Sequence, residues 1–376
     1  MTAFLPAPAL LSPPRRSRYF YTPLSCAKTA PQPSQSSQTS QPSPVASPSL
    51  ADTPINTFCG FAALVGPSNS GKSTLLNRLL GQKLAIVTPK VQTTRCRIAG
   101  LATSDATQVV YLDTPGIFPA SSRLARAMVK SAWKSAASAD AIAIVLDVAV
   151  MFHEGRRQDI RKLVVPKDTE TVMARVAEKR IKGHQAEIKL CANKIDAVPE
   201  EERPFVEERM HAVMEKTGLE EAGAQLHMMS ARYGNGVDEF ATWVKERMPM
   251  GPWLYPEDDL TDMPSRLLAA EVSREKAFMV LKQELPYEIA IETTSYKDLA
   301  DGSIRITQDV LVARKSQKMI VTGRGGAVIK EISMRARHEL AEVLGSTVHL
   351  ILTVKVRGKW KEDRRQYEQW GLDFNA

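Results

Sequence analysis

Cysteine is scarce in this 376-residue chain: there are four, and they lie far apart in the sequence. They form no C-x-x-C pair and have no histidine at ligand spacing. This argues against a disulfide framework and against a zinc site, and it favours a reducing compartment. Long apolar runs are also missing. A membrane-spanning helix needs about 18 or more consecutive apolar residues, and the best candidate, 141–152, is interrupted by Asp147. The sequence therefore predicts no transmembrane segment.

Acidic residues are absent from the first 51 positions, which contain four basic ones. This stretch is rich in Ser, Pro, Gln and Ala. Such a composition buries too little apolar area to offset chain entropy, so we expect residues 1–52 to be disordered. An acid-free, Arg-containing and Ser-rich leader is also typical of organelle transit peptides. We therefore expect import into an organelle, and the Ser and Pro content favours the chloroplast stroma over the mitochondrial matrix. A plain disordered tail is the alternative.

Basic charge is unevenly distributed along the chain, whose length indicates two domains plus additional segments at roughly 150 residues per domain. The formal net charge is +8, yet residues 311–365 alone contain thirteen Lys or Arg against five Asp or Glu. The chain between the leader and this segment is mildly acidic. A concentrated basic segment is typical of proteins that bind phosphate backbones, and a solvated face is the alternative.

A glycine-rich loop lies between a predicted buried strand at 61–65 and a predicted helix beginning at Thr74. It reads GPSNSGKS and satisfies G-x-x-x-x-G-K-[ST], the phosphate-loop pattern. Its amides and the helix N-terminus would surround the phosphates, Lys72 would reach the β- and γ-phosphates, and the Ser73 hydroxyl would bind Mg²⁺. The nucleotide contacts expected here are Gly66, Ser68, Asn69, Ser70, Gly71, Lys72, Ser73 and Thr74.

A second motif follows the predicted strand at 108–112, which ends in D-T-P-G. Asp113 would hold Mg²⁺ through water, and the Gly116 amide would sense the γ-phosphate.

Two more motifs predict which base is bound. Asn193, Lys194 and Asp196 form N-K-x-D after a strand at 187–191, and Lys194 would lie over the base plane. The Asp196 carboxylate can accept the N1 and N2 hydrogens of guanine, a pair that adenine lacks, so such a site rejects ATP. After a further strand at 226–229, the backbone of Ser230 and Ala231 would meet the guanine O6.

All four motifs follow strands, and open parallel sheets bind ligands at the carboxyl ends of their strands. The sequence therefore predicts a GTP-binding α/β P-loop domain over residues 53–248, with another strand at 141–146.

Catalytic groups are harder to identify. The segment V-Q-T-T-R at 91–95 offers Thr93 or Thr94 to complete the Mg²⁺ shell, unless the pair is merely a β-prone loop. Some GTPases orient the attacking water with a Gln after the D-x-x-G motif, but that position is Ile117. We therefore expect slow intrinsic turnover, helped by a cation, a backbone group or a partner. Asn69 either binds a monovalent cation or only tolerates the backbone angles of the loop. The catalytic candidates are Lys72, Thr93, Thr94 and Gly116.

A second pattern follows a proline-rich linker at 249–264. Its order of elements is that of an α+β KH domain, at 265–362, with a C-terminal tail at 363–376. The expected elements are a helix at 266–284, strands at 287–294 and 304–312, a helix leading through 318–322 into the loop Gly323-Arg324-Gly325-Gly326, a helix from Ile329 and a strand at 348–356.

The G-R-G-G loop is the candidate RNA-binding element, because KH glycine loops clamp the backbone of single-stranded RNA. A G-x-x-G sequence by itself is usually only a turn; here it lies in the KH order of elements and in the basic segment. Trp360, just beyond the last strand, either stacks on RNA or closes the domain edge. The RNA-binding candidates are Gly323, Arg324, Gly325, Gly326, Lys330 and Trp360.

From about Asn56 to Asp373 the chain resembles the Era family of GTPases. Besides the GTP motifs, the likeness is carried by GQKLAIVTPKVQTTR, GPWLYPEDDLTDMPSRLLAAE, SREKAFMVLKQELPYEIAIE, VTGRGGAVIKEI and VKVRGKWKEDRR. The resemblance implies a Ras-like G domain with a mostly parallel sheet, followed by a type II KH domain. It implies GTP hydrolysis with Mg²⁺ and K⁺, with Asn69 as the K⁺ ligand, and a hydrophobic residue at position 117.

The resemblance also implies partners. These are GTP and GDP, the 3′-terminal region of small-subunit rRNA, and the small ribosomal subunit whose assembly the family assists. We expect no DNA binding, and a monomer away from the ribosome. Two features depart from the family: Ser70 stands where it usually has Val, and the charged stretch at about 154–186 looks like a surface insertion on the G domain, in part helical. Partner docking is an alternative role for this stretch.

The first hypothesis is a GTPase that uses its GTP cycle to control when it binds rRNA. Two other hypotheses compete with it. One is an RNA-binding assembly factor that holds GTP with negligible turnover, which fits Ile117. The other is a GTPase at an organelle membrane whose basic tail meets anionic lipid; this explains the charge but not the KH pattern.

Overall fold

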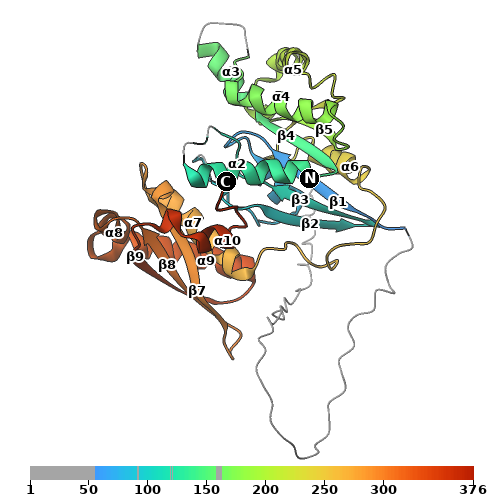
Figure 1. Ribbon diagram of the computed structural model, residues 1–376. Helices are drawn as coiled ribbons and strands as arrows, with labels where there is room; N and C mark the ends of the chain where they lie inside the picture. Colours follow the sequence, from blue (N-terminus) through green and yellow to red (C-terminus); the bar gives the residue numbers. More distant parts are fainter. Residues whose placement is uncertain (1–55, 91–92, 119, 121, 158–162) are drawn as a thin grey trace, which may run out of the picture. The chain divides into compact units, whose positions relative to one another are not determined.

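The computed structural model describes residues 56–90, 93–118, 120, 122–157 and 163–376, so the predicted transit peptide lies outside the described residues. The first half of the described chain is built around a six-stranded sheet in the order β2-β3-β1-β4-β5-β6 (Figure 1). All neighbouring strands are parallel except β2, which runs antiparallel to β3, so the predicted mostly parallel sheet is confirmed. The strands are β1 (Phe58–Val65), β2 (Ile98–Ser104), β3 (Thr107–Asp113), β4 (Ala141–Asp147), β5 (Glu187–Asn193) and β6 (Gln225–Met229).

Helices cover both faces of this sheet, because successive side chains of a buried strand point to opposite sides. Along β1, Ala62 and Leu64 pack in the cluster that contains residues of α1 and α6, whereas Ala63 and Val65 pack with α4 and α5. The helices are α1 (Lys72–Leu79), α2 (Arg123–Ala137), α3 (Val148–Arg157), α4 (Lys167–Ile181), α5 (Arg203–Thr217) and α6 (Val237–Lys245).

Strand β2 has no counterpart among the strands expected from the sequence. Its sequence, IAGLATS, is rich in Ala and Gly, which have low β-propensity. Gly100 is required by packing, because a Cβ there would lie 2.6 Å from Leu76 Cδ1 and 2.7 Å from Leu80 Cδ1. The position of β2 therefore depends on its packing against α1 and against Leu80, which follows α1, and not on the β-propensity of its own residues.

Residues 167–181 form a helix of the core, α4, so the predicted surface insertion at 154–186 is wrong for these residues. Strands β4 and β5 are parallel neighbours, and parallel neighbours need a crossover connection, usually a helix. Helix α4 lies in this connection and buries Val172, Met173 and Val176 in the core cluster that also contains α5. The charged outer face of α4 had concealed its apolar inner face.

The proline-rich linker is bound along the edge of the sheet instead of hanging free. Leu101 N donates to Leu260 O at 2.9 Å. The Gln108 side chain, which is fully buried, accepts from the backbone N of Leu254 and Tyr255 and donates to Tyr255 O. Such contacts limit how far the second domain can move away from the first.

The second half contains a three-stranded sheet in the order β7-β8-β9. Strands β7 and β8 form the predicted antiparallel pair, and β9 is parallel to β8, with α8 and α9 as the crossover. This is the KH order of elements. Helix α7 ends four residues before the predicted 284, because Leu281 is extended. The elements are α7 (Ser265–Val280), β7 (Ile289–Asp298), β8 (Ile304–Val312), α8 (Lys315–Thr322), α9 (Ala327–Leu344), β9 (Val348–Val356) and α10 (Arg364–Gln369).

The C-terminal tail packs back on the GTP-binding half, and the chain ends beside α2 (Figure 1). Lys130 of α2 forms an ion pair with Asp373 at 2.6 Å, and Arg123 lies 4.7 Å from the ring centre of Phe374. Trp370 and Tyr367 are buried. Within the part of the chain that the structure describes, no helix is long and apolar enough to cross a membrane.

Candidate nucleotide site and RNA-binding loop

The phosphate loop connects β1 to α1 and has the backbone geometry that its glycines allow. Gly66 and Gly71 have φ of 148° and 99°, in the region that favours glycine. A Cβ at Gly71 would lie 2.2 Å from Asn193 Nδ2. Asn69 is also left-handed at φ 63°, and its Nδ2 donates to Pro89 O at 2.8 Å. Asn69 thus meets the loop's backbone requirement, which was the plainer of its two expected roles.

Lys72 is folded into the loop with its ammonium group nearly buried. Its Nζ donates to Pro67 O at 2.7 Å and to Gly66 O at 3.2 Å. Burial lowers the pKa of Lys72 to about 8, partly offset by the negative charge of Asp113. Bound phosphates would favour the charged form, so the lysine is poised to gain from an anion at this position.

Three oxygen-bearing side chains converge beside the loop. Ser73 Oγ lies 2.6 Å from Asp113 Oδ2 and 3.0 Å from Thr94 Oγ1, and Thr94 Oγ1 donates to Asp113 Oδ2 at 3.4 Å. Asp113 is fully buried, its Oδ1 has no hydrogen-bond partner among the described residues, and burial raises its pKa. An orphaned carboxylate oxygen flanked by hydroxyls fits Mg²⁺, which prefers hard oxygen ligands.

The same geometry distinguishes the two threonines. Thr94 Oγ1 faces Ser73 and Asp113, and we call these three side chains the Mg²⁺ cradle. Thr93 Oγ1 instead donates to Lys90 O at 2.7 Å and lies 2.8 Å from Thr88 Oγ1. Thr94 is therefore the metal candidate. The described residues contain no cluster of three or more His, Cys, Asp or Glu that could hold a metal ion. The cradle combines the carboxylate of Asp113 with the hydroxyl groups of Ser73 and Thr94.

The guanine motifs meet at the far end of the loop. Asn193 Nδ2 donates to Ser70 O at 2.8 Å, and Asn193 Oδ1 accepts from Ala231 N at 2.9 Å, so this side chain ties two loops together. Asp196 Oδ1 accepts from Ser230 Oγ at 2.5 Å. The Asp196 side chain is exposed, as a base-reading carboxylate must be.

Lys194 has an additional partner that sequence reasoning missed. Its Nζ donates to Asn69 O at 2.7 Å and pairs with Asp147 at the end of β4. Asp147 was noted only for interrupting an apolar run. Its register opposite Asn193 in the parallel pair of β4 and β5 is the signal that could have identified it.

Two residues after β3 act through packing. Ile117 is buried in the core, and its N donates to Gly66 O at 3.0 Å, so its side chain cannot orient water. Gly116 approaches the phosphate loop so closely that a Cβ would lie 2.8 Å from Ser68 N. The structure thus brings the D-x-x-G motif against the phosphate loop but provides no water-orienting side chain at position 117.

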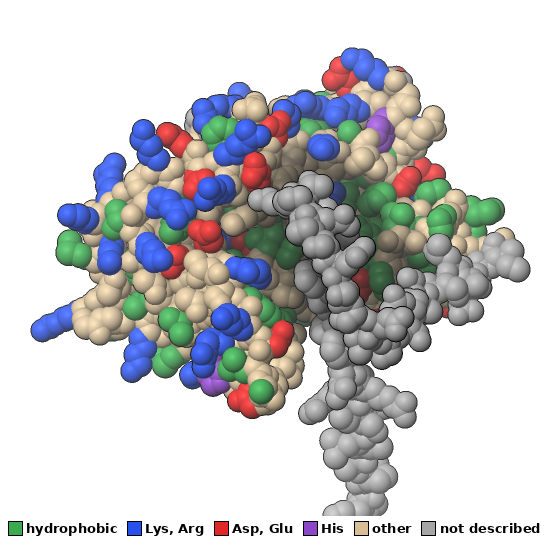
Figure 2. Space-filling view, turned by 60° about the horizontal axis from the view of Figure 1, so that its bottom comes forward, with side chains coloured by type: hydrophobic (Ala, Val, Ile, Leu, Met, Phe, Trp, Pro, Cys, Tyr) green, Lys and Arg blue, Asp and Glu red, His purple; other side chains and the backbone are tan. Residues whose placement is uncertain are grey.

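The G-R-G-G loop lies between α8 and α9. Gly323, Gly325 and Gly326 all have left-handed φ, of 73°, 60° and 80°. Arg324 and Lys330 are exposed. Lys and Arg side chains gather over the left part of Figure 2, the side that holds the second domain in Figure 1. This surface suits a phosphate backbone.

The structure corrects the prediction that Trp360 contacts RNA. It is 0% exposed, its ring lies 5.7 Å from the guanidinium carbon of Arg95, and it packs edge-on against Trp370. A buried ring cannot stack on RNA, so Trp360 closes the domain edge, which was the alternative. Its burial depends on the tail.

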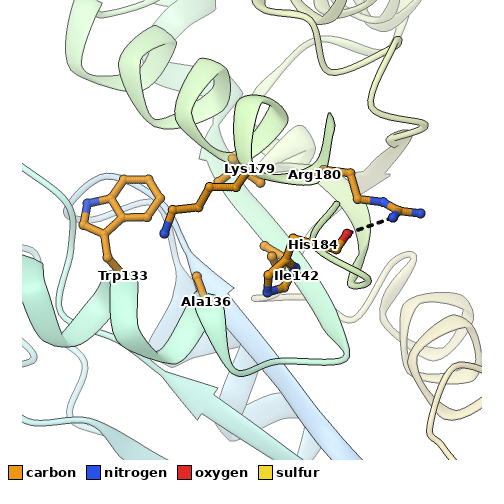
Figure 3. Close-up of a pocket in the computed structure, with 7 residues that line it drawn as sticks. Trp133, Ala136, Ile142, Lys179, Arg180 and His184 are labelled. Carbon is orange, nitrogen blue, oxygen red and sulfur yellow. Dashed lines mark hydrogen bonds between the residues drawn. The ribbon is translucent and has the colours of Figure 1, made fainter. Parts of the chain in front are cut away.

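A recess between α2 and α4 is lined by none of the residues of these loops (Figure 3). Lys179 Nζ is 5.3 Å from the ring centre of Trp133, and Arg180 donates to His184 O at 2.8 Å. Its volume of about 10 Å³ admits roughly one water molecule. It cannot be the nucleotide site.

Comparison with known proteins gives a consistent result. Residues 61–194 match the model of the 50S ribosome-binding GTPase family, and residues 284–361 match that of the KH domain. GTPase Era of Maricaulis maris is 43% identical over 87% of this chain and 100% of its own length, and that of Caulobacter vibrioides (strain NA1000 / CB15N) is 40% identical over 87% and 100%. A solved Era of Aquifex aeolicus bound to GDP·AlF4⁻ has a TM-score of 0.70 at 32% identity, covering 84% of this chain and 99% of that one. A solved Era in complex with MgGDPNP and nucleotides 1506–1542 of 16S ribosomal RNA has a TM-score of 0.71 at 32% identity, with the same coverage. The chain therefore belongs to the Era family of GTPases.

Proposed function

We propose that this GTPase couples its nucleotide cycle to the binding of small-subunit ribosomal RNA and assists assembly of the small ribosomal subunit in an organelle. The observation that carries the proposal is that one compact unit, residues 54–376, contains both a guanine-nucleotide site and a KH glycine loop. The solved Era with MgGDPNP and 16S rRNA supports the pairing of these ligands. The RNA in this proposal is the 3′-terminal region of small-subunit rRNA.

In this proposal each part of the site has a defined role. The phosphate loop and Lys72 hold the phosphates, and Asp196 reads the guanine. Ser73, Thr94 and Asp113 would hold Mg²⁺, which neutralises charge on the β- and γ-phosphates. Ile117 cannot orient the attacking water, so we expect hydrolysis to depend on K⁺, which would stabilise the negative charge on the phosphates. The oxygen of the Asn69 amide is its candidate ligand, since the Asn69 nitrogen already donates to Pro89 O.

Turnover of GTP by the full chain tests the proposal. We expect it to be slow in NaCl and to rise when KCl replaces NaCl and when RNA matching the 3′ end of organelle small-subunit rRNA is added. Cations and hydrogen-bond donors that stabilise the charge on a transferring phosphoryl group raise the rate by orders of magnitude. An unrelated single-stranded RNA of equal length is the control. Tight binding of GTP and RNA with flat, negligible turnover would favour the alternative, a GTP-loaded assembly factor.

The organelle is part of the proposal and rests on the composition of residues 1–52. We expect isolated chloroplasts to take up the radiolabelled full chain and shorten it at its N-terminus. Isolated mitochondria serve as the comparison. Uptake by mitochondria alone would move the proposed site of action to the mitochondrial matrix, and uptake by neither would contradict the transit peptide.

A further inference from the structure

The segment that leads into the Mg²⁺ cradle lies against the KH domain. We call residues 83–90 and 93–95 the switch segment. Lys83 pairs with Glu275 of α7 at 2.8 Å and with Glu339 of α9 at 2.6 Å. At the other end, Arg95 donates to Ile289 O at 2.7 Å. The KH domain therefore provides partners at both ends of the switch segment.

One contact runs in the opposite direction, from the KH domain into the switch segment. Arg274 of α7 donates through Nη2 to Thr93 O at 2.5 Å. The same guanidinium is held by Glu271, which accepts from Arg274 Nε at 2.9 Å and pairs with Nη2. Both side chains are almost fully buried, at 2% relative exposure. A planar guanidinium fixed by a carboxylate on the same helix presents a donor in one defined direction.

The residue that Arg274 holds is one peptide unit from the cradle. The Thr93 carbonyl and the Thr94 amide belong to the same planar group. Fixing the Thr93 oxygen therefore restricts the plane from which Thr94 extends. Thr94 Oγ1, in turn, lies 3.0 Å from Ser73 Oγ. The chain of contacts from Glu271 through Arg274 and Thr93 to Thr94 thus connects a KH helix to the metal cradle of the GTP site.

We propose that Arg274, held by Glu271, is a positioning residue for GTP hydrolysis that orients Thr94 from the KH domain. It acts only through the switch segment and touches neither the phosphates nor the metal cradle. Because Thr94 is expected to complete the Mg²⁺ shell when GTP is bound, the effect belongs to the GTP state rather than the GDP state. The inference rests on the proposed function, since it concerns how that GTP cycle is built.

The test replaces the buried pair in the full chain by apolar residues of similar size, Glu271→Met with Arg274→Met. Removing both partners leaves neither member of this pair behind as a buried unpaired charge. We expect kcat at saturating GTP to fall between about ten- and a hundredfold, the size of effect that a misplaced positioning contact causes. Affinity for a non-hydrolysable GTP analogue with Mg²⁺ should weaken, while affinity for GDP stays within about twofold.

A matched control is Lys83→Met, which breaks another contact between the switch segment and α7 but leaves Thr93 untouched. It should leave kcat and the ratio of GTP-analogue to GDP affinity near those of the unsubstituted protein. Arg274→Lys keeps a cation against Glu271 but lacks the planar fork, and its kcat and affinity ratio should lie between those of the double variant and the unsubstituted protein.

Three outcomes would overturn the positioning role. They are an unchanged kcat and affinity ratio in the folded double variant, parallel losses of GDP and GTP-analogue affinity, and an equal loss in Lys83→Met. If the double variant does not fold, Arg274→Lys decides, and an unchanged affinity ratio there counts against the proposal. Absence of turnover in the unsubstituted protein with KCl and RNA would instead defeat the proposed GTP cycle. The affinity ratio would still decide the role of Arg274.

Discussion

Replacing Gly325 with Asp is expected to lower the affinity for single-stranded rRNA by about a hundredfold or more, because bringing like charges together at an interface costs several kcal/mol. Gly325 is exposed, and no atom lies within 4 Å of a Cβ placed on it, so the new side chain fits without collision. Its carboxylate would stand where the loop approaches an RNA phosphate. GTP binding and turnover without RNA should not change.

The control for this prediction is Gly345→Asp in the same domain. Gly345 has φ 61° against 60° for Gly325, is likewise exposed, and has no atom within 4 Å of a Cβ. Backbone strain and change in net charge are therefore matched. Fluorescence anisotropy with labelled RNA gives the affinities, and thermal melting shows that both variants fold. Equal loss of RNA binding in the two variants would trace the effect to net charge and contradict a clamp at the G-R-G-G loop.

Residues whose chemistry is encoded locally could be placed from the sequence. The phosphate loop needs its glycines, Lys72 and Ser73 at fixed spacing, and N-K-x-D needs its carboxylate at the last position. Both motifs therefore carry their geometry within a few residues. Strands β1, β3 and β4 were found for a similar reason, because strands buried on both faces are nearly continuous apolar runs. Strands β5 and β6 include polar residues and were placed because a nucleotide motif follows each of them. KH strand β9 was found from its alternation.

Features set by distant contacts could not be placed. Whether Thr93 or Thr94 faces the cradle is decided by neighbours such as Arg274, 181 residues away from Thr93. Trp360 is buried because the tail folds back over it, and no local pattern shows this. Helix α4 carries charges on its outer face, so its role as a crossover became visible only once β4 and β5 were seen to pair. In each case the deciding term is tertiary packing.

The second large effect is expected from Asp196→Asn, which should exchange guanine for xanthine as the preferred base. The carboxylate accepts two hydrogens from guanine, whereas an amide offers one donor and one acceptor. Xanthine has a carbonyl oxygen where guanine has its 2-amino group, so it matches the amide. A site built to hydrogen-bond one ligand rejects a ligand without the matching group by about a hundredfold up to ten-thousandfold or more. We therefore expect GTP affinity to fall by at least about a hundredfold and XTP affinity to rise.

The surrounding loops should survive this substitution, which makes the result interpretable. Asp196 Oδ1 accepts from Ser230 Oγ, a bond that an amide oxygen can also accept, and Asn193 ties the Ala231 loop independently. The matched control is Asp238→Asn at the exposed start of α6, which should bind GTP normally. Equilibrium binding of GDP and XDP in both variants, with melting curves, gives the comparison. Loss of GDP without gain of XDP in a folded Asp196→Asn protein would mean that the carboxylate supports the Ser230 loop and does not read the base, because a reader of the base edge must transfer its preference to the complementary base.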